Sequence, residues 1–242
     1  MTLKPVCLVV GAGDALGGSI AKRFAREGFM VCLARRTADK LADLKAGIEQ
    51  SGGSAMAFGC DARREEQVVA LVDRIEREHG AIEVLVHNVG GNVRESILDM
   101  TAEKFFKTWE MACMAGFLTG REAARRMVPR GRGTILFTGA TASMRGGAMY
   151  AGFSAGKAGL RMVAQSMARE LGPKGIHVAH VVVDGGIDTA FIRANFPERY
   201  ALKDRDGILN PEHIAENYWM LHKQPRDAWT FELDVRPWIE KW

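Results

Sequence analysis

The feature that most constrains the fold is the order strand, glycine loop, helix at the beginning of the chain. Residues 6–10 form an apolar run, VCLVV, and residues 11–18 continue it as GAGDALGG before a segment with helical periodicity. Glycines let a backbone turn tightly and approach a pyrophosphate, whose charge is then stabilised by the N-terminus of the following helix. In this context the loop is predicted to bind the phosphates of a nucleotide.

Apolar runs and helical-period segments alternate along the rest of the chain. The runs lie at residues 6–10, 30–34, 55–59, 84–87, 134–138, 178–183 and 229–235. The helical segments lie at residues 16–27, 38–51, 63–79, 102–127, 150–171 and 211–222. Solidly apolar strands are typical of a parallel sheet buried on both faces, and right-handed crossovers then give a doubly wound topology. We therefore expect an α/β fold, a single domain over residues 1–242 with a seven-stranded parallel sheet and helices on both faces.

Residues 190–210 are the least regular part of this pattern. They are polar, contain Pro197 and Gly207, and follow the sixth predicted strand, so we interpret them as a mobile flap over the substrate site. Aromatic residues such as Phe196 alternate there with Arg193 and Arg199. This mixture is compatible with an apolar substrate that carries an acidic group, and equally with an ordinary surface.

Composition excludes several classes of function. The formal net charge is +4, but Lys and Arg are interspersed with Asp and Glu, which favours a solvated surface over nucleic-acid binding. The four cysteines mostly lie in apolar runs and form no Cys-x-x-Cys motif, so we expect buried thiols in a reducing compartment, with no disulfide and no metal site. No run is long enough for a membrane helix and no signal peptide is evident, which favours a cytoplasmic location.

Three motifs resemble those of the short-chain dehydrogenase/reductase family. Residues 10–17, VGAGDALG, are similar to Thr-Gly-x-x-x-Gly-x-Gly, residues 87–90, HNVG, to Asn-Asn-Ala-Gly, and Asp61 to the family's aspartate near the adenine ring. The resemblance extends from residue 6 to about residue 235 and implies a Rossmann fold, a nicotinamide cofactor and a small-molecule substrate. The cofactor-binding residues that it implies are Gly11, Gly13, Asp14, Ala15, Leu16, Gly17, Arg35, Arg36, Asp61, Ala62, Asn88, Val89, Gly90, Lys157, Gly185, Ile187 and Thr189.

The end of the second strand predicts the choice of cofactor. An NAD enzyme places an acidic residue there to bind the ribose 2′-hydroxyl, whereas this chain has Arg35 and Arg36. Two guanidinium groups suit a 2′-phosphate, so we expect NADP(H) to be preferred over NAD(H).

The resemblance also identifies what the chain lacks. Residues 150–157, YAGFSAGK, are similar to the family's Tyr-Ala-Ala-Tyr-Ser-Ala-Ser-Lys, so Lys157 is kept, but Phe153 stands in place of the catalytic tyrosine. Ala140 and Cys113 stand in place of the family's serine and asparagine. Phenylalanine has no proton to donate, and general acid catalysis contributes about 10²- to 10⁴-fold in rate.

Two other residues are candidate proton donors. The alternative is a protein that binds the nucleotide but has no catalytic activity. Tyr150 precedes Lys157 by seven residues, about 10 Å along a helix, a spacing that resembles the enoyl-thioester reductase branch of the superfamily. Asp184 replaces the proline of the family's Pro-Gly after the sixth strand, and a desolvated carboxyl there could hold a proton. The sequence thus predicts an oxidoreductase with Lys157, Tyr150 and Asp184 as catalytic candidates, or a nucleotide-binding sensor or subunit without activity.

Assembly and the end of the chain complete the expectations. Residues 160–168 carry Leu, Met and Ala at helical spacing, more apolar surface than one sheet face covers, so we expect a homo-oligomer, a dimer or a tetramer. His87 and His180 lie on apolar strands and are interpreted as hydrogen-bonded core residues. Trp229, Trp238 and Trp242 are interpreted as core and subunit-contact aromatics.

Overall fold

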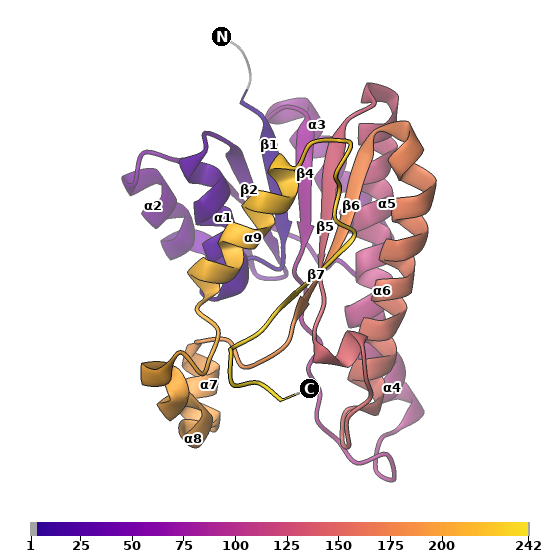
Figure 1. The fold of residues 1–242 in the computed structure, drawn as a ribbon. Coiled ribbons are helices and arrows are strands. Elements are labelled where there is room, and N and C mark those ends of the chain that lie inside the picture. Colours follow the sequence, from indigo (N-terminus) through magenta and orange to yellow (C-terminus); the bar gives the residue numbers. More distant parts are fainter. Residues whose placement is uncertain (1–3, 242) are drawn as a thin grey trace.

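The computed structural model describes residues 4–241, whose strands form one parallel sheet of seven strands. The strand order is β3-β2-β1-β4-β5-β6-β7 (Figure 1), which confirms the predicted doubly wound α/β fold. The strands are β1 (Val6–Val10), β2 (Met30–Arg35), β3 (Ser54–Gly59), β4 (Ile82–His87), β5 (Gly133–Thr138), β6 (Ile176–Val183) and β7 (Glu232–Val235).

Helices cover both faces of the sheet, because nearly every residue of the central strands is buried and most of these residues are apolar. On one face the core is closed by α1 (Leu16–Arg26), α2 (Ala42–Gln50) and α9 (Pro211–Lys223). On the other face it is closed by α3 (Glu65–Glu78), α5 (Ala115–Met127) and α6 (Ala151–Leu171). The helix α4 (Ala102–Trp109) packs against α6 below the sheet (Figure 1). All four cysteines are free and buried, as expected.

The predicted helix over residues 102–127 is wrong in one respect. Residues Glu110–Met114 form a π-helical turn between α4 and α5, and the buried Cys113 lies in it. A π turn adds one residue to a helical turn, which apolar periodicity does not reveal. The segment over residues 38–51 likewise begins as a 3₁₀ helix, Ala38–Leu41, before α2.

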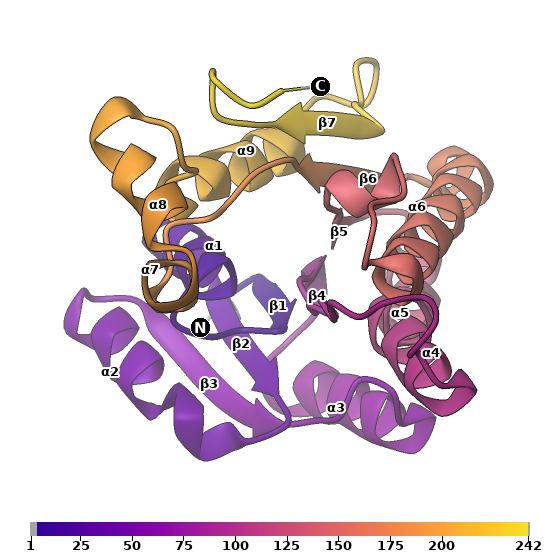
Figure 2. The ribbon, with the colours of Figure 1, turned by 90° about the horizontal axis from the view of Figure 1, so that it is seen from below.

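Residues 190–210 are more regular than the sequence predicts. They form α7 (Ala190–Asn195), α8 (Pro197–Tyr200) and a 3₁₀ helix, Ala201–Arg205. The Thr189 hydroxyl caps α7 by accepting a hydrogen bond from Ile192 N at 3.2 Å, and Pro197 stands in the first turn of α8. The prediction of an irregular segment is therefore corrected, because short capped helices are too brief to show an apolar period. Figure 2 shows this flap at one side of the sheet, near α1 and α9.

The tryptophans near the end of the chain differ in environment. Trp229 is half-buried and stacks on His177 with ring centroids 4.9 Å apart. Trp238 is 77% exposed, so it is not a core residue, and Trp242 lies outside the described residues. None of the described helices is long and apolar enough to cross a membrane.

The topology decides where a ligand can enter. The connections that follow β1 and β4 leave in opposite directions along the sheet, so a crevice opens at the carboxyl ends of these two neighbours. The loops after β1, β4, β5 and β6 all reach this edge, which Figure 2 shows end-on.

Candidate functional site

The glycine loop lies at this crevice and is held close to the loop after β4. Gly11 has a φ of 88°, and a Cβ added to it would lie 2.5 Å from the carbonyl oxygen of Asn88. The Asn88 side chain in turn donates a hydrogen bond to the Gly11 carbonyl at 3.2 Å. Only glycine fits this close approach, so the loop follows the floor of the crevice and leads into the N-terminus of α1.

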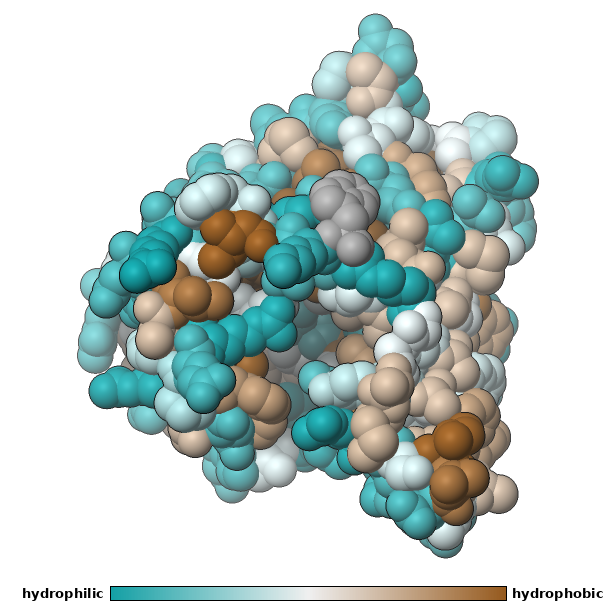
Figure 3. All heavy atoms as spheres, turned by 60° about the horizontal axis from the view of Figure 1, so that its bottom comes forward, coloured by the Kyte–Doolittle hydropathy of each residue, from teal (hydrophilic) through white to brown (hydrophobic). Residues whose placement is uncertain are grey.

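Two adjoining cavities run along this edge of the sheet. The first, of about 750 Å³, lies over the glycine loop and the ends of β2 and β3. The second, of about 560 Å³, lies over the ends of β5 and β6. They share Ala15, Asn88, Val89, Gly90 and Asn92, so together they form one elongated site. Figure 3 looks onto this face of the molecule, which is hollowed near its centre.

Basic side chains surround the outer end of the first cavity. Arg35 and Arg36 both line it, and the Arg35 Nη1 atom lies 3.7 Å from where a Cβ on Gly13 would be. Thr37 and Lys40, which the sequence analysis does not single out, line the same end. A hydroxyl, an ammonium and two guanidinium groups form a set of donors suited to an anion.

Asp61 lines the same cavity but is already paired. Arg63 binds its two carboxylate oxygens with Nε at 2.9 Å and Nη2 at 2.6 Å. The hydrogen bonds from Arg63 lower the pKa of Asp61 below its usual range. The carboxylate is therefore charged and fixed in direction at the far end of the first cavity.

Lys157 lines the second cavity, next to Val89, which both cavities share, and it is almost completely buried. Its Nζ donates to the carbonyl oxygen of Thr138 at 2.8 Å and to that of Val89 at 3.2 Å, so it joins the ends of β5 and β4. Burial lowers the pKa of Lys157 to about 8, because few charges compensate its own inside the protein. Near neutral pH the ammonium form still prevails, and a modest rise in pH removes it.

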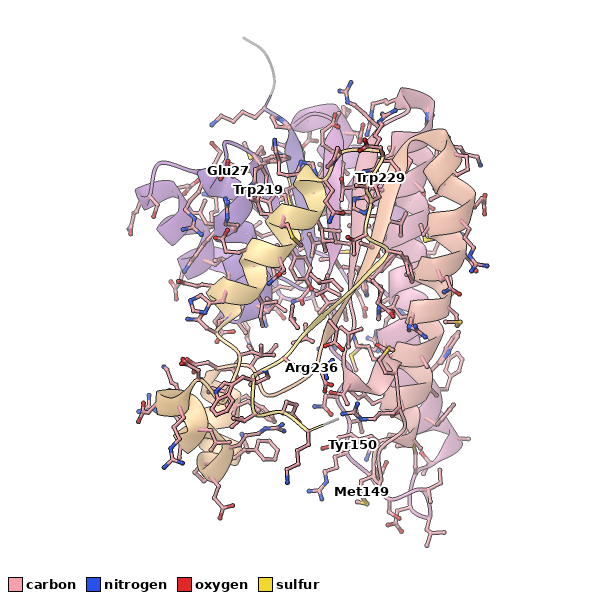
Figure 4. All side chains as sticks on the ribbon, in the orientation of Figure 1. Glu27, Met149, Tyr150, Trp219, Trp229 and Arg236 are labelled. Atoms are coloured by element: carbon pink, nitrogen blue, oxygen red, sulfur yellow. The ribbon has the colours of Figure 1, made fainter. Side chains whose placement is uncertain are left out.

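Phe153 and Tyr150 form the aromatic wall of the second cavity. Their ring centroids are 6.5 Å apart, and both side chains line the cavity with Ala140. Tyr150 precedes α6 and follows Met149, whose φ of 72° is a left-handed conformation held by a hydrogen bond from Glu95 N to the Met149 carbonyl at 2.7 Å. Figure 4 shows Tyr150 and Met149 together at the lower edge of the molecule.

Asp184 is buried beneath the second cavity and does not line it. Its carboxylate accepts a hydrogen bond from the Thr141 hydroxyl, and the Arg145 guanidinium lies 3.5 Å away. Through these two contacts Asp184 ties the loop after β6 to the loop after β5.

The two histidines are core residues, as interpreted from the sequence. His87 contacts the Thr119 hydroxyl through Nδ1 at 3.0 Å, and burial lowers the pKa of His87 to about 3. His180 contacts Glu232 through Nδ1 at 3.0 Å, and burial lowers the pKa of His180 to about 4. Both rings are therefore neutral at physiological pH.

The structure brings together most, but not all, of the residues predicted from the sequence. Those of the glycine loop, of strand 2 and of the loops after β3 and β4 line the first cavity, and Leu16, Lys157, Gly185 and Ile187 line the second. Thr189 lines neither, because its hydroxyl caps α7. Cys113 is buried in the π turn and also lines neither cavity.

Three charged residues of the second cavity were not predicted from the sequence as site residues. Arg145, Arg199 and Glu240 line it from the loop after β5, from α8 and from the segment after β7. Arg199 was noted only as one of several basic residues in the flap. Arg145 and Glu240 belong to no local sequence motif, and only the fold brings them to the same cavity.

Comparison with known proteins identifies the family. A model of the short chain dehydrogenase family matches residues 5–199. The chain belongs to the short-chain dehydrogenase/reductase family. An L-rhamnose 1-dehydrogenase (NAD(P)(+)) of Azotobacter vinelandii is 34% identical over 187 residues, which are 75% of this chain and 73% of that protein.

Solved structures of the short-chain dehydrogenase/reductase family have the same fold. A short-chain dehydrogenase from Rhodopseudomonas palustris is 47% identical, with a TM-score of 0.83 and coverage of 97% of this chain and 99% of that one. A metagenomic short-chain oxidoreductase in complex with NADP is 25% identical, with a TM-score of 0.83 and coverage of 96% and 97%. The family consists of oxidoreductases that bind nicotinamide cofactors, which agrees with the elongated site at the switch point of the sheet.

Proposed function

We propose that this protein is an NADP(H)-dependent oxidoreductase that transfers hydride to a carbonyl or enoyl substrate and uses a non-standard proton donor. The observation that carries the proposal is the continuity of the two cavities. A glycine loop with basic side chains lies at one end and an aromatic cavity lies at the other. The buried Lys157 lines the aromatic cavity next to Val89, which both cavities share.

The residues present fit a dinucleotide phosphate. The backbone of residues 11–15 and the N-terminus of α1, which has no acidic residue in its first turn, would hold the pyrophosphate. Arg35, Arg36 and Lys40 would hold a 2′-phosphate at the outer end. Asp61 would face the adenine, and Lys157 would hold the nicotinamide ribose.

The cofactor, when bound, supplies the hydride. The substrate must then gain a proton, which Phe153 has no group to donate. The Tyr150 hydroxyl lies on the same wall of the same cavity and is our first candidate. The Lys157 ammonium, acting directly or through water, is the second, since its lowered pKa of about 8 brings it close to physiological pH.

Asp184 is a weaker candidate than the sequence implies. It does not line the second cavity, and its carboxylate already accepts a hydrogen bond from Thr141 and lies beside Arg145. We propose that it positions the loops after β5 and β6.

A protein that binds the cofactor without catalysis is the alternative. Phe153, Ala140 and Cys113 favour it, since together they remove the hydroxyl groups and the amide that family members use. The intact phosphate loop supports cofactor binding under both hypotheses.

The test is consumption of NADPH with a panel of ketones, aldehydes, 3-oxoacyl thioesters and enoyl thioesters. We expect NADPH to bind, and at least one substrate class to be reduced. If NADPH binds tightly and is consumed with none of these classes, the protein is a silent binder. If neither NADPH nor NADH binds, both hypotheses are wrong.

A further inference from the structure

An ion pair crosses the mouth of the second cavity. The Arg199 Nη2 atom on α8 lies 2.9 Å from the Glu240 Oε2 atom, although 41 residues separate the two positions. Both side chains line the cavity, and both are partly exposed, at 45% for Arg199 and 23% for Glu240. The pair therefore forms part of the cavity's rim, where both side chains remain accessible to solvent.

The last residues of the described chain, 236–241, bring Glu240 to this position. The ring of Pro237 lies 2.7 Å from where a Cβ on Gly185 would be, so the segment is pressed onto the loop after β6. Trp238 Nε1 donates to the Arg205 carbonyl at 3.0 Å, and Arg145 Nη2 donates to the Lys241 carbonyl at 3.4 Å. Figure 1 shows this segment leaving β7, approaching α7 and turning back across the lower edge of the sheet.

Arg199 also packs against the backbone of the loop after β6, at Gly186. A Cβ on Gly186 would lie 3.2 Å from Arg199 Nε and 3.3 Å from its Cδ, so the stem of Arg199 rests on the loop after β6. A larger residue at Gly186 would push the stem away. The guanidinium is thus held at the rim of the cavity by the loop beneath it and by Glu240.

The charges around the cavity are unequal. The described residues that line it include three cations, Arg145, Lys157 and Arg199, and one acid, Glu240. Arg145 is partly compensated by the buried Asp184 below. Arg199 is compensated by Glu240, so removal of that one carboxylate leaves a guanidinium facing the aromatic cavity.

We propose that the substrate carries a carboxylate, that Arg199 binds it, and that Glu240 occupies this anion position until the substrate displaces it. The inference rests on the proposed function and specifies its substrate class as oxo or enoyl acids. The observation in its favour is that the Glu240 carboxylate already binds the Arg199 guanidinium at this position. The exchange replaces one carboxylate by another on the same donor, so the guanidinium stays paired while the displaced Glu240 carboxylate, whose side chain is 23% exposed, is solvated by water.

Equilibrium binding tests this without requiring turnover. Pyruvate, acetoacetate, 4-oxopentanoate and 5-oxohexanoate, which differ in the distance from carbonyl to carboxylate, are titrated by calorimetry into the enzyme saturated with NADP⁺, each beside its neutral methyl ester. We expect at least one acid to bind about tenfold more tightly than its ester, as one charge-assisted hydrogen bond allows.

Two variants assign the effect to the ion pair. Glu240→Gln should tighten binding of that acid about three- to tenfold and leave the ester unchanged, because it removes the internal competitor. Arg199→Met should make the acid bind no better than the ester. The matched controls are Glu198→Gln and Arg193→Met, which alter the same charges on exposed flap residues outside the cavity and should change neither affinity.

Equal binding of every acid and ester to the wild type, or an unchanged acid affinity in Glu240→Gln, would overturn the inference. Failure of the proposed function looks different. In that case Arg199 still selects the acid in the calorimeter, and NADPH is not consumed.

Discussion

Lys157 Nζ donates a hydrogen bond to the carbonyl oxygen of Thr138 at 2.8 Å, and this contact fixes a buried cation in the wall of the second cavity. Thr138 is the last residue of β5, and Lys157 lies in the second turn of α6. The lysine that the sequence retains is therefore held by the backbone, and its position does not depend on the tyrosine that the chain lacks.

The lowered pKa of Lys157 predicts a loss of activity at alkaline pH. If the ammonium holds the cofactor or donates the proton, turnover should be constant below pH 8 and fall as pH rises through the pKa of about 8. Lys157→Arg should move this break to higher pH, because a guanidinium stays charged. A pH–rate profile measures both. A break near 8 that persists in Lys157→Arg would assign it to another group.

Stability should change in the opposite sense over the same range. The folded pKa of Lys157 is lowered, so the cost of burying its charge is present below pH 8 and is relieved as pH rises toward the unfolded value near 10.4. We expect this residue to raise the free energy of unfolding by up to about 3 kcal/mol over that window. Urea titrations of wild type and Lys157→Met show the difference, with Lys174→Met, an exposed residue in the 3₁₀ turn after α6, as the control.

Tyr150→Phe tests the proposed proton donor. The change removes one hydroxyl and leaves the ring that packs beside Phe153, so little cavity is created. We expect turnover to fall at least ~10²-fold while NADPH affinity stays the same. Steady-state rates beside a cofactor titration measure the two effects. Full activity in Tyr150→Phe would transfer the role to Lys157 or to water.

Phe153→Tyr is the converse change. It restores a Tyr-x-x-x-Lys spacing with Lys157, so weak reduction of ketones should appear, and Ala140→Ser in the same chain should strengthen it by adding a hydroxyl to the same cavity. The readout is NADPH consumption with a ketone panel. No gain in either variant would show that this region differs from that of active relatives in more than these two side chains.

The basic end of the first cavity predicts cofactor preference. We expect NADPH to bind more tightly than NADH, and Arg35→Ala to weaken NADPH about tenfold while NADH changes little, because a charge-assisted contact to the 2′-phosphate is lost. Calorimetry with both cofactors provides the measurement. Arg64→Ala, an exposed change outside the cavity, is the control, and equal affinities in the wild type would contradict the prediction.

The sequence by itself determined the sheet, the glycine loop and the retained Lys157. These features depend on apolar runs, glycine spacing and short motifs. Each of these patterns spans only a few consecutive residues, so it can be recognised in the sequence alone. For example, the strand that precedes the glycine loop was predicted as Val6–Val10, and β1 has the same bounds in the structure.

Only the tertiary structure decided what surrounds the reacting groups. Arg199 meets Glu240 across 41 residues and Asp184 meets Thr141 across 43, because the carboxyl ends of β5, β6 and β7 lie at one edge of the sheet. The π turn at Cys113 and the lowered pKa of Lys157 were likewise visible only in the tertiary structure. Both depend on how helices pack and on how far water is excluded, which are properties of the assembled core and not of any local run of residues.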